Sequence, residues 1–241
     1  MTLRIAMWSG PRNISTAMMR AWENRPDTAV WDEPFYGHYL SATGLDHPGA
    51  ADITAAGGTD WQVIANACAG PAPNDRAVFF QKHMTHHMLD HIDRGWMADV
   101  VNCFLIRRPD EVLSSYLRSR PSATAEDIGF IQQAELVGHA DALQGNTIIL
   151  ESSEVLANPE RVLRTLCAHL GIAFDDAMLS WPAGKRDTDG VWGPHWYDAV
   201  WASTEFMAYR PKEISIPHEF EPIVAECQPY YDELYARRLR P

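Results

Sequence analysis

The chain has 241 residues, 46% of them hydrophobic and 22% charged, a globular composition that excludes intrinsic disorder, collagen and a coiled coil. Its 32 aspartate and glutamate residues outnumber its 20 lysine and arginine residues, so the net charge is −12. An acidic protein repels nucleic acid and anionic membranes, so we expect neither as a partner, and any anionic ligand needs a local basic site.

Short apolar runs bounded by turn residues predict five buried strands, at residues 3–8, 28–31, 77–81, 100–106 and 146–150. Helical patterns occupy residues 15–23, 111–119, 125–143, 159–170 and 223–239. The Gly, Asp, Ser and Pro residues within 40–58 predict a lid-like excursion, and the prolines within 181–194 predict a long loop. This alternation predicts an α/β fold, a single domain over residues 1–241 with a mostly parallel sheet flanked by helices.

The N-terminal residues lack the layout of a signal peptide, and no apolar run approaches the ~20 residues that span a bilayer. The four cysteines form no C-x-x-C pair, which is typical of reduced thiols in a protein interior. We therefore expect a cytoplasmic protein. A homodimer is left open.

A candidate anion-binding loop follows the first strand, with the sequence Ser-Gly-Pro-Arg-Asn-Ile-Ser-Thr over residues 9–16. A loop that leads into a helix offers unpaired backbone N–H groups and the positive end of the helix dipole. Arg12 adds a planar fork for phosphate or sulfate oxygens, and Ser15 and Thr16 add hydroxyls. The alternative is a Ser/Thr-capped helix beside an incidental arginine.

A second basic element, Arg107 and Arg108, follows the fourth strand, and Pro109 then begins a helix that carries Ser115. Two arginines at the end of a buried strand are costly unless an anion pairs with them. The alternative is two surface ion pairs.

Taken together, these segments resemble the sulfotransferases that use 3′-phosphoadenosine 5′-phosphosulfate (PAPS). Residues 11–16 match the family's 5′-phosphosulfate loop, and Arg107, Pro109 and Ser115 have the spacing of its 3′-phosphate element. Residues 150–160, which close on Leu-Gly-Ile at 170–172, look like its strand, D/N-P link and helix, and residues 185–192 are similar to its basic loop.

The resemblance implies a P-loop nucleoside-triphosphate-hydrolase-like fold without NTP hydrolysis, with PAPS as co-substrate. The 5′-phosphosulfate would be bound by Arg12 and by the amides around Asn13, Ile14, Ser15 and Thr16. The 3′-phosphate would be bound by Arg107 and Ser115, with Lys185 and Arg186 as helpers. Ile14 stands where many members have glycine.

Sulfuryl transfer needs cations at the bridging oxygen and a base for the acceptor. Lys82, at the end of the third strand, is the candidate cation together with Arg12. His83 is a candidate base, with His86 as second choice. We rank Glu33 above His83, because its Glu-Pro-Phe segment is similar to that of trehalose-type bacterial sulfotransferases, where a glutamate is the base.

Strand alternation predicts that only one of Asp32 and Glu33 faces the site. The alternative role for Glu33 is a helix N-cap. The four-residue spacing of His83, His87 and His91 permits a metal site on a helix face, but no carboxylate or cysteine completes it, so we expect no metal.

The expected activity is transfer of a sulfuryl group from PAPS to a hydroxyl or amine of a small-molecule acceptor. Two alternatives are a P-loop kinase-like nucleotide enzyme, disfavoured by the missing Gly-Lys of the Walker pattern, and a nucleotide-binding module without transfer activity, suggested by Ile14. Aromatic residues in two segments, 35–39 and 192–201, stay unassigned as candidates for the acceptor site.

Overall fold

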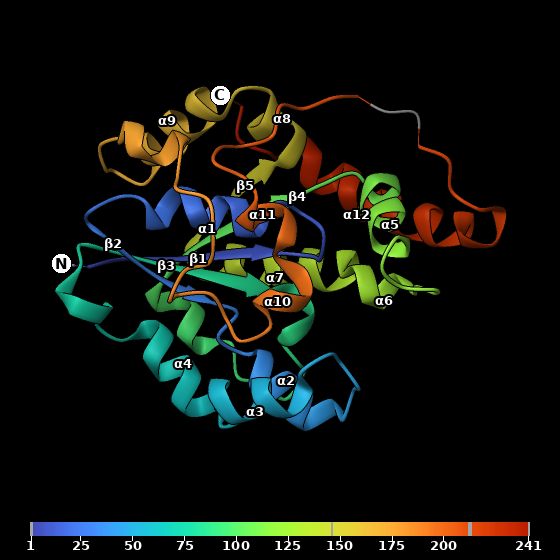
Figure 1. Cartoon of the computed structure of the whole chain (residues 1–241), viewed down its shortest axis with the longest axis horizontal. Coiled ribbons are helices and arrows are strands. Elements are labelled where there is room, and N and C mark those ends of the chain that lie inside the picture. Colours follow the sequence, from blue (N-terminus) through green and yellow to red (C-terminus); the bar gives the residue numbers. More distant parts are fainter. Residues whose placement is uncertain (1, 146, 212–213, 241) are drawn as a thin grey trace.

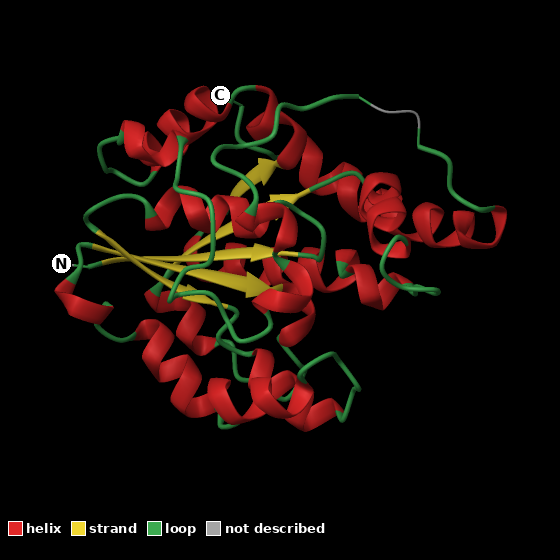
Figure 2. Ribbon diagram, viewed as in Figure 1, coloured by secondary structure: helices red, strands yellow, loops and turns green. Residues whose placement is uncertain are grey.

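The computed structural model describes residues 2–145, 147–211 and 214–240. At its centre lies a five-stranded parallel sheet with the order β2-β3-β1-β4-β5, with helices on both faces (Figures 1 and 2). The strands are β1 (Leu3–Ser9), β2 (Thr28–Asp32), β3 (Val78–Met84), β4 (Val101–Ile106) and β5 (Ile148–Glu151).

Alternating side chains give the sheet two buried faces, as their period of two requires. Ile5 and Met7 pack with α1 (Ser15–Glu23), α8 (Ser152–Ala157) and α9 (Pro159–His169). On the other face, Ala6 and Trp8 belong to the core formed with α4 (Trp61–Ala69), α5 (Pro109–Leu117), α7 (Phe130–Gln144) and α12 (Glu221–Ala236). Both faces are apolar, which explains the continuous apolar runs in the sequence.

The predicted α/β fold is confirmed, and the five predicted strands occur with shifts of one to three residues at their ends. Residue Asn146, the predicted first residue of the fifth strand, lies outside the described residues. Four of the predicted helices correspond to α1, α5, α9 and α12. Among the described residues, no helix combines the length and the apolar character needed to cross a bilayer.

The single helix predicted over residues 125–143 is two helices, α6 (Ala125–Ile128) and α7. Gly129 between them has a φ of 73°, in the left-handed region that interrupts a right-handed helix. A capping box between Thr124 and Asp127 fixes the start of α6. The apolar spacing alone did not reveal this break.

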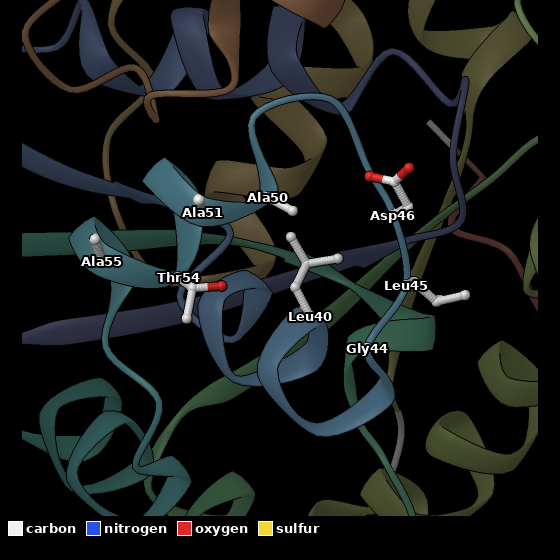
Figure 3. A pocket seen from close by; sticks show the side chains of 8 residues that line it. All are labelled: Leu40, Gly44, Leu45, Asp46, Ala50, Ala51, Thr54 and Ala55. Atoms are coloured by element: carbon white, nitrogen blue, oxygen red, sulfur yellow. The ribbon is translucent and has the colours of Figure 1, made fainter.

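The excursion predicted over residues 40–58 is largely helical, with α2 (Tyr36–Thr43) and α3 (Ala50–Gly57) packed together. A surface hollow of about 520 Å³ lies at these helices, and Leu40, which lines it, points toward Ala50 (Figure 3). The loop predicted over residues 181–194 is present up to residue 192, where the short helix α10 (Gly193–Trp196) begins, and α11 (Asp198–Trp201) follows.

Candidate functional site

The loop between β1 and α1 has the backbone geometry of an anion-binding turn. Arg12 and Ile14 have φ values of 58° and 53°, both in the left-handed region. Ile14 is the N-cap of α1 and makes no side-chain capping bond, while Ser15 and Thr16 are the first helical residues. The capped-helix alternative is therefore wrong, and Ile14 adopts a conformation that glycine reaches more easily.

Asn13 holds this loop against the ends of the neighbouring strands. Its Nδ2 donates to the carbonyl oxygen of Leu105 at 2.7 Å, and the hydroxyl of Ser152 contacts its Oδ1. The side chain of Asn13 is buried. Its side chain thus fixes the loop, which leaves the backbone amide as the group that Asn13 can offer an anion.

Three arginines converge beside the loop. Arg12 Nε donates to Ser115 Oγ at 3.0 Å, Arg118 Nη2 donates to the same oxygen at 2.8 Å, and Arg107 Nη1 donates to the carbonyl oxygen of Arg12 at 2.8 Å. No described carboxylate forms an ion pair with Arg12 or Arg118. Partial burial, together with the charges of Arg118 and Arg107, lowers the pKa of Arg12. Three like charges, of which Arg12 and Arg118 have no described counter-charge, form a site for an anion.

The structure thus brings together the predicted residues Arg12, Arg107 and Ser115, and it adds Arg118, which the sequence analysis missed. The signal for Arg118 was its spacing, because residues three apart share a helix face and Arg118 follows Ser115 by three. The sequence analysis gave two surface ion pairs as the alternative for Arg107 and Arg108. This alternative holds for Arg108, which pairs with Asp110 at 2.6 Å. Arg107 also pairs with Glu111, at 2.8 Å.

Lys82 lies at the centre of a buried charged network at the end of β3. Its Nζ donates to Asp32 Oδ1 and to the hydroxyl of Tyr197, both at 2.9 Å, and to Glu33 Oε1. These three partners use all three protons of the ammonium group. The two carboxylates raise the pKa of Lys82 far enough to outweigh its burial, so the lysine stays charged. Tyr197 in turn donates to Asp32 Oδ2 at 2.7 Å.

The alternation prediction for Asp32 and Glu33 is wrong, because both carboxylates contact Lys82. Glu33 has a φ of 41°, and this left-handed residue turns its side chain back toward β3. The N-cap alternative is also wrong, since the N-cap of α2 is Phe35. Burial, and then the charge of Asp32, raises the pKa of Glu33 despite Lys82. Its side chain is 10% exposed, against 1% for Asp32, so Glu33 is the carboxylate that reaches the surface of the network.

The three histidines after Lys82 lie in different environments. His83 is buried, stacks on Trp8 with ring centroids 4.4 Å apart, and has its pKa lowered to about 3 by burial. Strand alternation places it on the opposite face of β3 from Lys82. His86 has its pKa lowered to about 4, also by burial. His87, which was considered only as a metal ligand, is the one beside Glu33, with Nδ1 4.0 Å from Oε2.

The shared helix face expected for His83, His87 and His91 does not exist, because His83 lies in β3 and His87 in the 3₁₀ turn Thr85–His87. Within the described part of the chain, no group of three or more His, Cys, Asp and Glu side chains is arranged to hold a metal ion.

Lys185 and Arg186 lie in the loop before α10. Hydrogen bonds of Asp189 join this loop to α1. Asp189 of this loop accepts from Arg20 Nη2 at 2.6 Å and from the backbone N–H of Arg186 at 2.9 Å. Lys185 Nζ lies 4.7 Å from the centre of the Trp201 ring. In residues 2–145, 147–211 and 214–240, no hydrogen bond joins these two side chains to the arginine cluster around Ser115.

Comparisons with known proteins agree with this geometry. The family model described as a sulfotransferase domain matches residues 3–238. Two Arabidopsis thaliana proteins, named branched-chain-amino-acid aminotransferase-like protein 2 and protein 1, are 32% and 31% identical to this chain over 234 residues. The match covers 95% of this chain and 41% of each relative, so the chain spans about two-fifths of their length.

Solved sulfotransferase structures share the fold. The sulfotransferase domain of the Synechococcus PCC 7002 olefin synthase has a TM-score of 0.60 at 14% identity, over 98% of this chain and 95% of that domain. The sulfotransferase domain of the curacin biosynthetic pathway has a TM-score of 0.59 at 16% identity, over 100% and 99%. The Alicyclobacillus acidocaldarius sulfotransferase has a TM-score of 0.57 at 12% identity, over 100% and 98%. Because the family model matches nearly the whole of this chain, the chain belongs to the sulfotransferase domain family.

Proposed function

We propose that this chain transfers a sulfuryl group from PAPS to a hydroxyl or amine of a small-molecule acceptor. The observation that carries the proposal is the convergence of Arg12 and Arg118 on Ser115 Oγ, with Arg107 on the carbonyl oxygen of Arg12. A nucleotide with phosphate groups at both its 3′ and 5′ positions would supply the anions that Arg12 and Arg118 lack among the described residues.

On the donor side, Arg107, Arg118 and Ser115 would bind the 3′-phosphate, and Arg12 with the N-terminal amides of α1 would bind the 5′-phosphosulfate. Arg12 would also stabilise the charge that develops on the leaving oxygen. Lys185 and Arg186 would assist only if their loop moved, because their present contacts hold them beside α1 and Trp201.

On the acceptor side, Glu33 would take the proton of the attacking group. Its raised pKa suits it to this role better than an exposed carboxylate. We assign Lys82 to positioning Glu33 rather than to the leaving oxygen, because its three protons already have partners. His83 is the less favoured base, since it stacks on Trp8 within the core.

Kinase chemistry has less support, since family membership favours sulfuryl transfer and the Walker lysine is missing. The two relatives are named aminotransferase-like, but this chain matches only 41% of their length, so their names give no reason to propose aminotransferase activity for it.

The deciding experiment is a thermal melt of the full chain with 3′-phosphoadenosine 5′-phosphate, AMP and ATP–Mg²⁺, followed by a transfer assay with PAPS. A ligand at ~100 times its Kd adds ~2.7 kcal/mol of stability. For a chain of this size the melting temperature would rise by roughly 5–10 °C. We expect this shift with the 3′-phosphorylated nucleotide and not with AMP. A shift with ATP–Mg²⁺ alone would support the kinase alternative, and binding without transfer to any acceptor would support the binding module.

A further inference from the structure

Two arginines just after the C-terminal end of α5 contact different parts of the molecule. Arg118 donates to Ser115 and joins the donor cluster. Arg120, two residues later, lies with its guanidinium carbon 5.4 Å from the centre of the Trp196 ring in α10. Arg120 is half-buried, and no ion pair joins it to a carboxylate of the described residues. The donor assignment therefore leaves Arg120 without a role.

A cluster of aromatic and histidine side chains connects Arg120 to Glu33. Tyr36 stacks on His87 at 4.6 Å, and the Nδ1 of His87 lies 4.0 Å from Glu33 Oε2. Burial and the charge of Glu33 raise the pKa of Tyr36, while Arg120 acts in the opposite direction. Trp196, over which Arg120 lies, packs against the same hydrophobic cluster as Tyr36, so Tyr36 lies between the proposed base and this arginine.

Asp127 forms no ion pair with Arg120 among the described residues. Asp127 Oδ2 accepts from the backbone N–H of Thr124 at 2.8 Å and from its hydroxyl at 3.0 Å, which ties the carboxylate to the start of α6. Arg120 itself is fixed by its backbone N–H, which donates to the carbonyl oxygen of Tyr116 at 3.1 Å. The guanidinium lies over Trp196, and among the described residues no side-chain hydrogen bond or ion pair uses its fork.

We propose that Arg120 binds a carboxylate of the acceptor, so that the substrate is a hydroxy or amino acid whose nucleophilic group lies at Glu33. A single guanidinium fork matches the planar geometry and the single charge of a carboxylate. A phosphate carries more charge, and the three-arginine donor cluster suits it better. The inference rests on the proposed function and adds the chemical class of the acceptor.

In the reaction, the acceptor oxygen or nitrogen forms a bond to sulfur while the bond from sulfur to the bridging oxygen of the 5′-phosphate breaks. Glu33 receives the acceptor's proton, and 3′-phosphoadenosine 5′-phosphate leaves with the bonding electron pair. Arg120 takes no part in these steps. It would hold the acceptor so that its nucleophile, and not its carboxylate, faces Glu33.

The test compares hydroxy acids with their methyl esters, using 4-hydroxyphenylacetate, 4-hydroxybenzoate and 3-hydroxybutyrate in PAPS transfer assays and in melts at saturating 3′-phosphoadenosine 5′-phosphate. We expect at least one acid to exceed its ester about tenfold in kcat/KM. R120A would lower kcat/KM for that acid by about 10- to 100-fold, mainly through KM, and leave the ester within twofold, as loss of a charge-assisted contact requires. R120K, which keeps the charge without the fork, would fall between.

The control variant is R164A, which removes another arginine from an aromatic ring, here Phe174 at 4.2 Å, and should change neither substrate. Equal use of acids and esters by the wild type, or an undiminished acid preference in a folded R120A, would overturn the inference. So would the failure of every acid to bind or react. If 3′-phosphoadenosine 5′-phosphate itself causes no shift in the wild type, the proposed function fails as well, and the two failures are thereby distinguished.

Discussion

Two charged clusters lie at the same edge of the sheet, and they are built in opposite ways. The donor cluster gathers Arg12, Arg107 and Arg118 with one ion pair, from Arg107 to Glu111, among its described contacts. The base cluster surrounds Lys82 with two carboxylates and a tyrosine, and its groups compensate one another within the protein.

This difference matches the roles that we propose for the two clusters. A site that binds an anion needs cations that are not fully neutralised within the protein, at the cost of repulsion in the free protein. A site that holds a base must fix the base in place and adjust its pKa, which requires desolvation and buried partners. The donor cluster is consequently open to solvent, while Asp32 and Lys82 are almost completely buried.

The largest expected effect comes from Glu33→Gln, which tests whether the base cluster supplies the base. Loss of a general base lowers kcat by about 10²–10⁴. Because burial raises the pKa of Glu33, and the rate follows its ionised form, the wild-type rate should fall as pH decreases, at a higher pH than for an exposed glutamate. The measurement is a pH–rate profile of PAPS turnover, with a thermal melt to confirm that donor binding is unchanged.

The control for Glu33→Gln is Glu160→Gln, which changes a glutamate in an exposed ion pair. Activity within threefold of wild type would move the base to another residue.

Lys82→Met tests whether the base cluster depends on internal compensation. It leaves Asp32 and Glu33 buried without their cation, and breaking a buried ion pair costs about 3–5 kcal/mol. Urea unfolding should show this loss, and Arg164→Ala, at a surface pair, should lose no more than about 1 kcal/mol. Adding Asp32→Asn to Lys82→Met should restore part of the stability. Equal losses in the two single variants would mean that the buried network contributes little.

Arg118→Ala tests the opposite property of the donor cluster. A charge-assisted contact contributes about 1.5–3 kcal/mol, so the Kd for 3′-phosphoadenosine 5′-phosphate should rise by roughly 10- to 100-fold. Stability should hardly change, since the substitution removes an uncompensated charge. Calorimetric titration gives the Kd, and Arg108→Ala, which removes a similarly exposed arginine paired with Asp110, is the control. Equal affinities for the two variants would exclude Arg118 from the donor site.

The sequence predicted the donor cluster better than the base cluster. Arg107 precedes α5, which carries Ser115, and the spacing of the two residues was recognised through the family resemblance, as was the loop around Arg12. Glu33 was named, but its approach to Lys82 depends on a left-handed φ that no pattern signals in a non-glycine residue. Tyr197 reaches Asp32 from 165 residues away, and such long-range contacts follow from tertiary packing alone.

The smallest expected effect is at Ile14, where the donor loop itself carries strain. Its φ of 53° costs an L-residue about 1–2 kcal/mol, and glycine avoids that cost. The half-buried side chain packs against the core on the α1 face, so glycine loses contacts that offset the relief. Ile14→Gly should therefore stay within about 1 kcal/mol of wild type, whereas Ile14→Ala keeps the strain and loses the contacts. Urea unfolding should find the glycine variant more stable than the alanine variant by about 1 kcal/mol, the reverse of the usual helix propensities. If the alanine variant were the more stable, the loop would not be strained at Ile14. The donor cluster would then not depend on a left-handed turn.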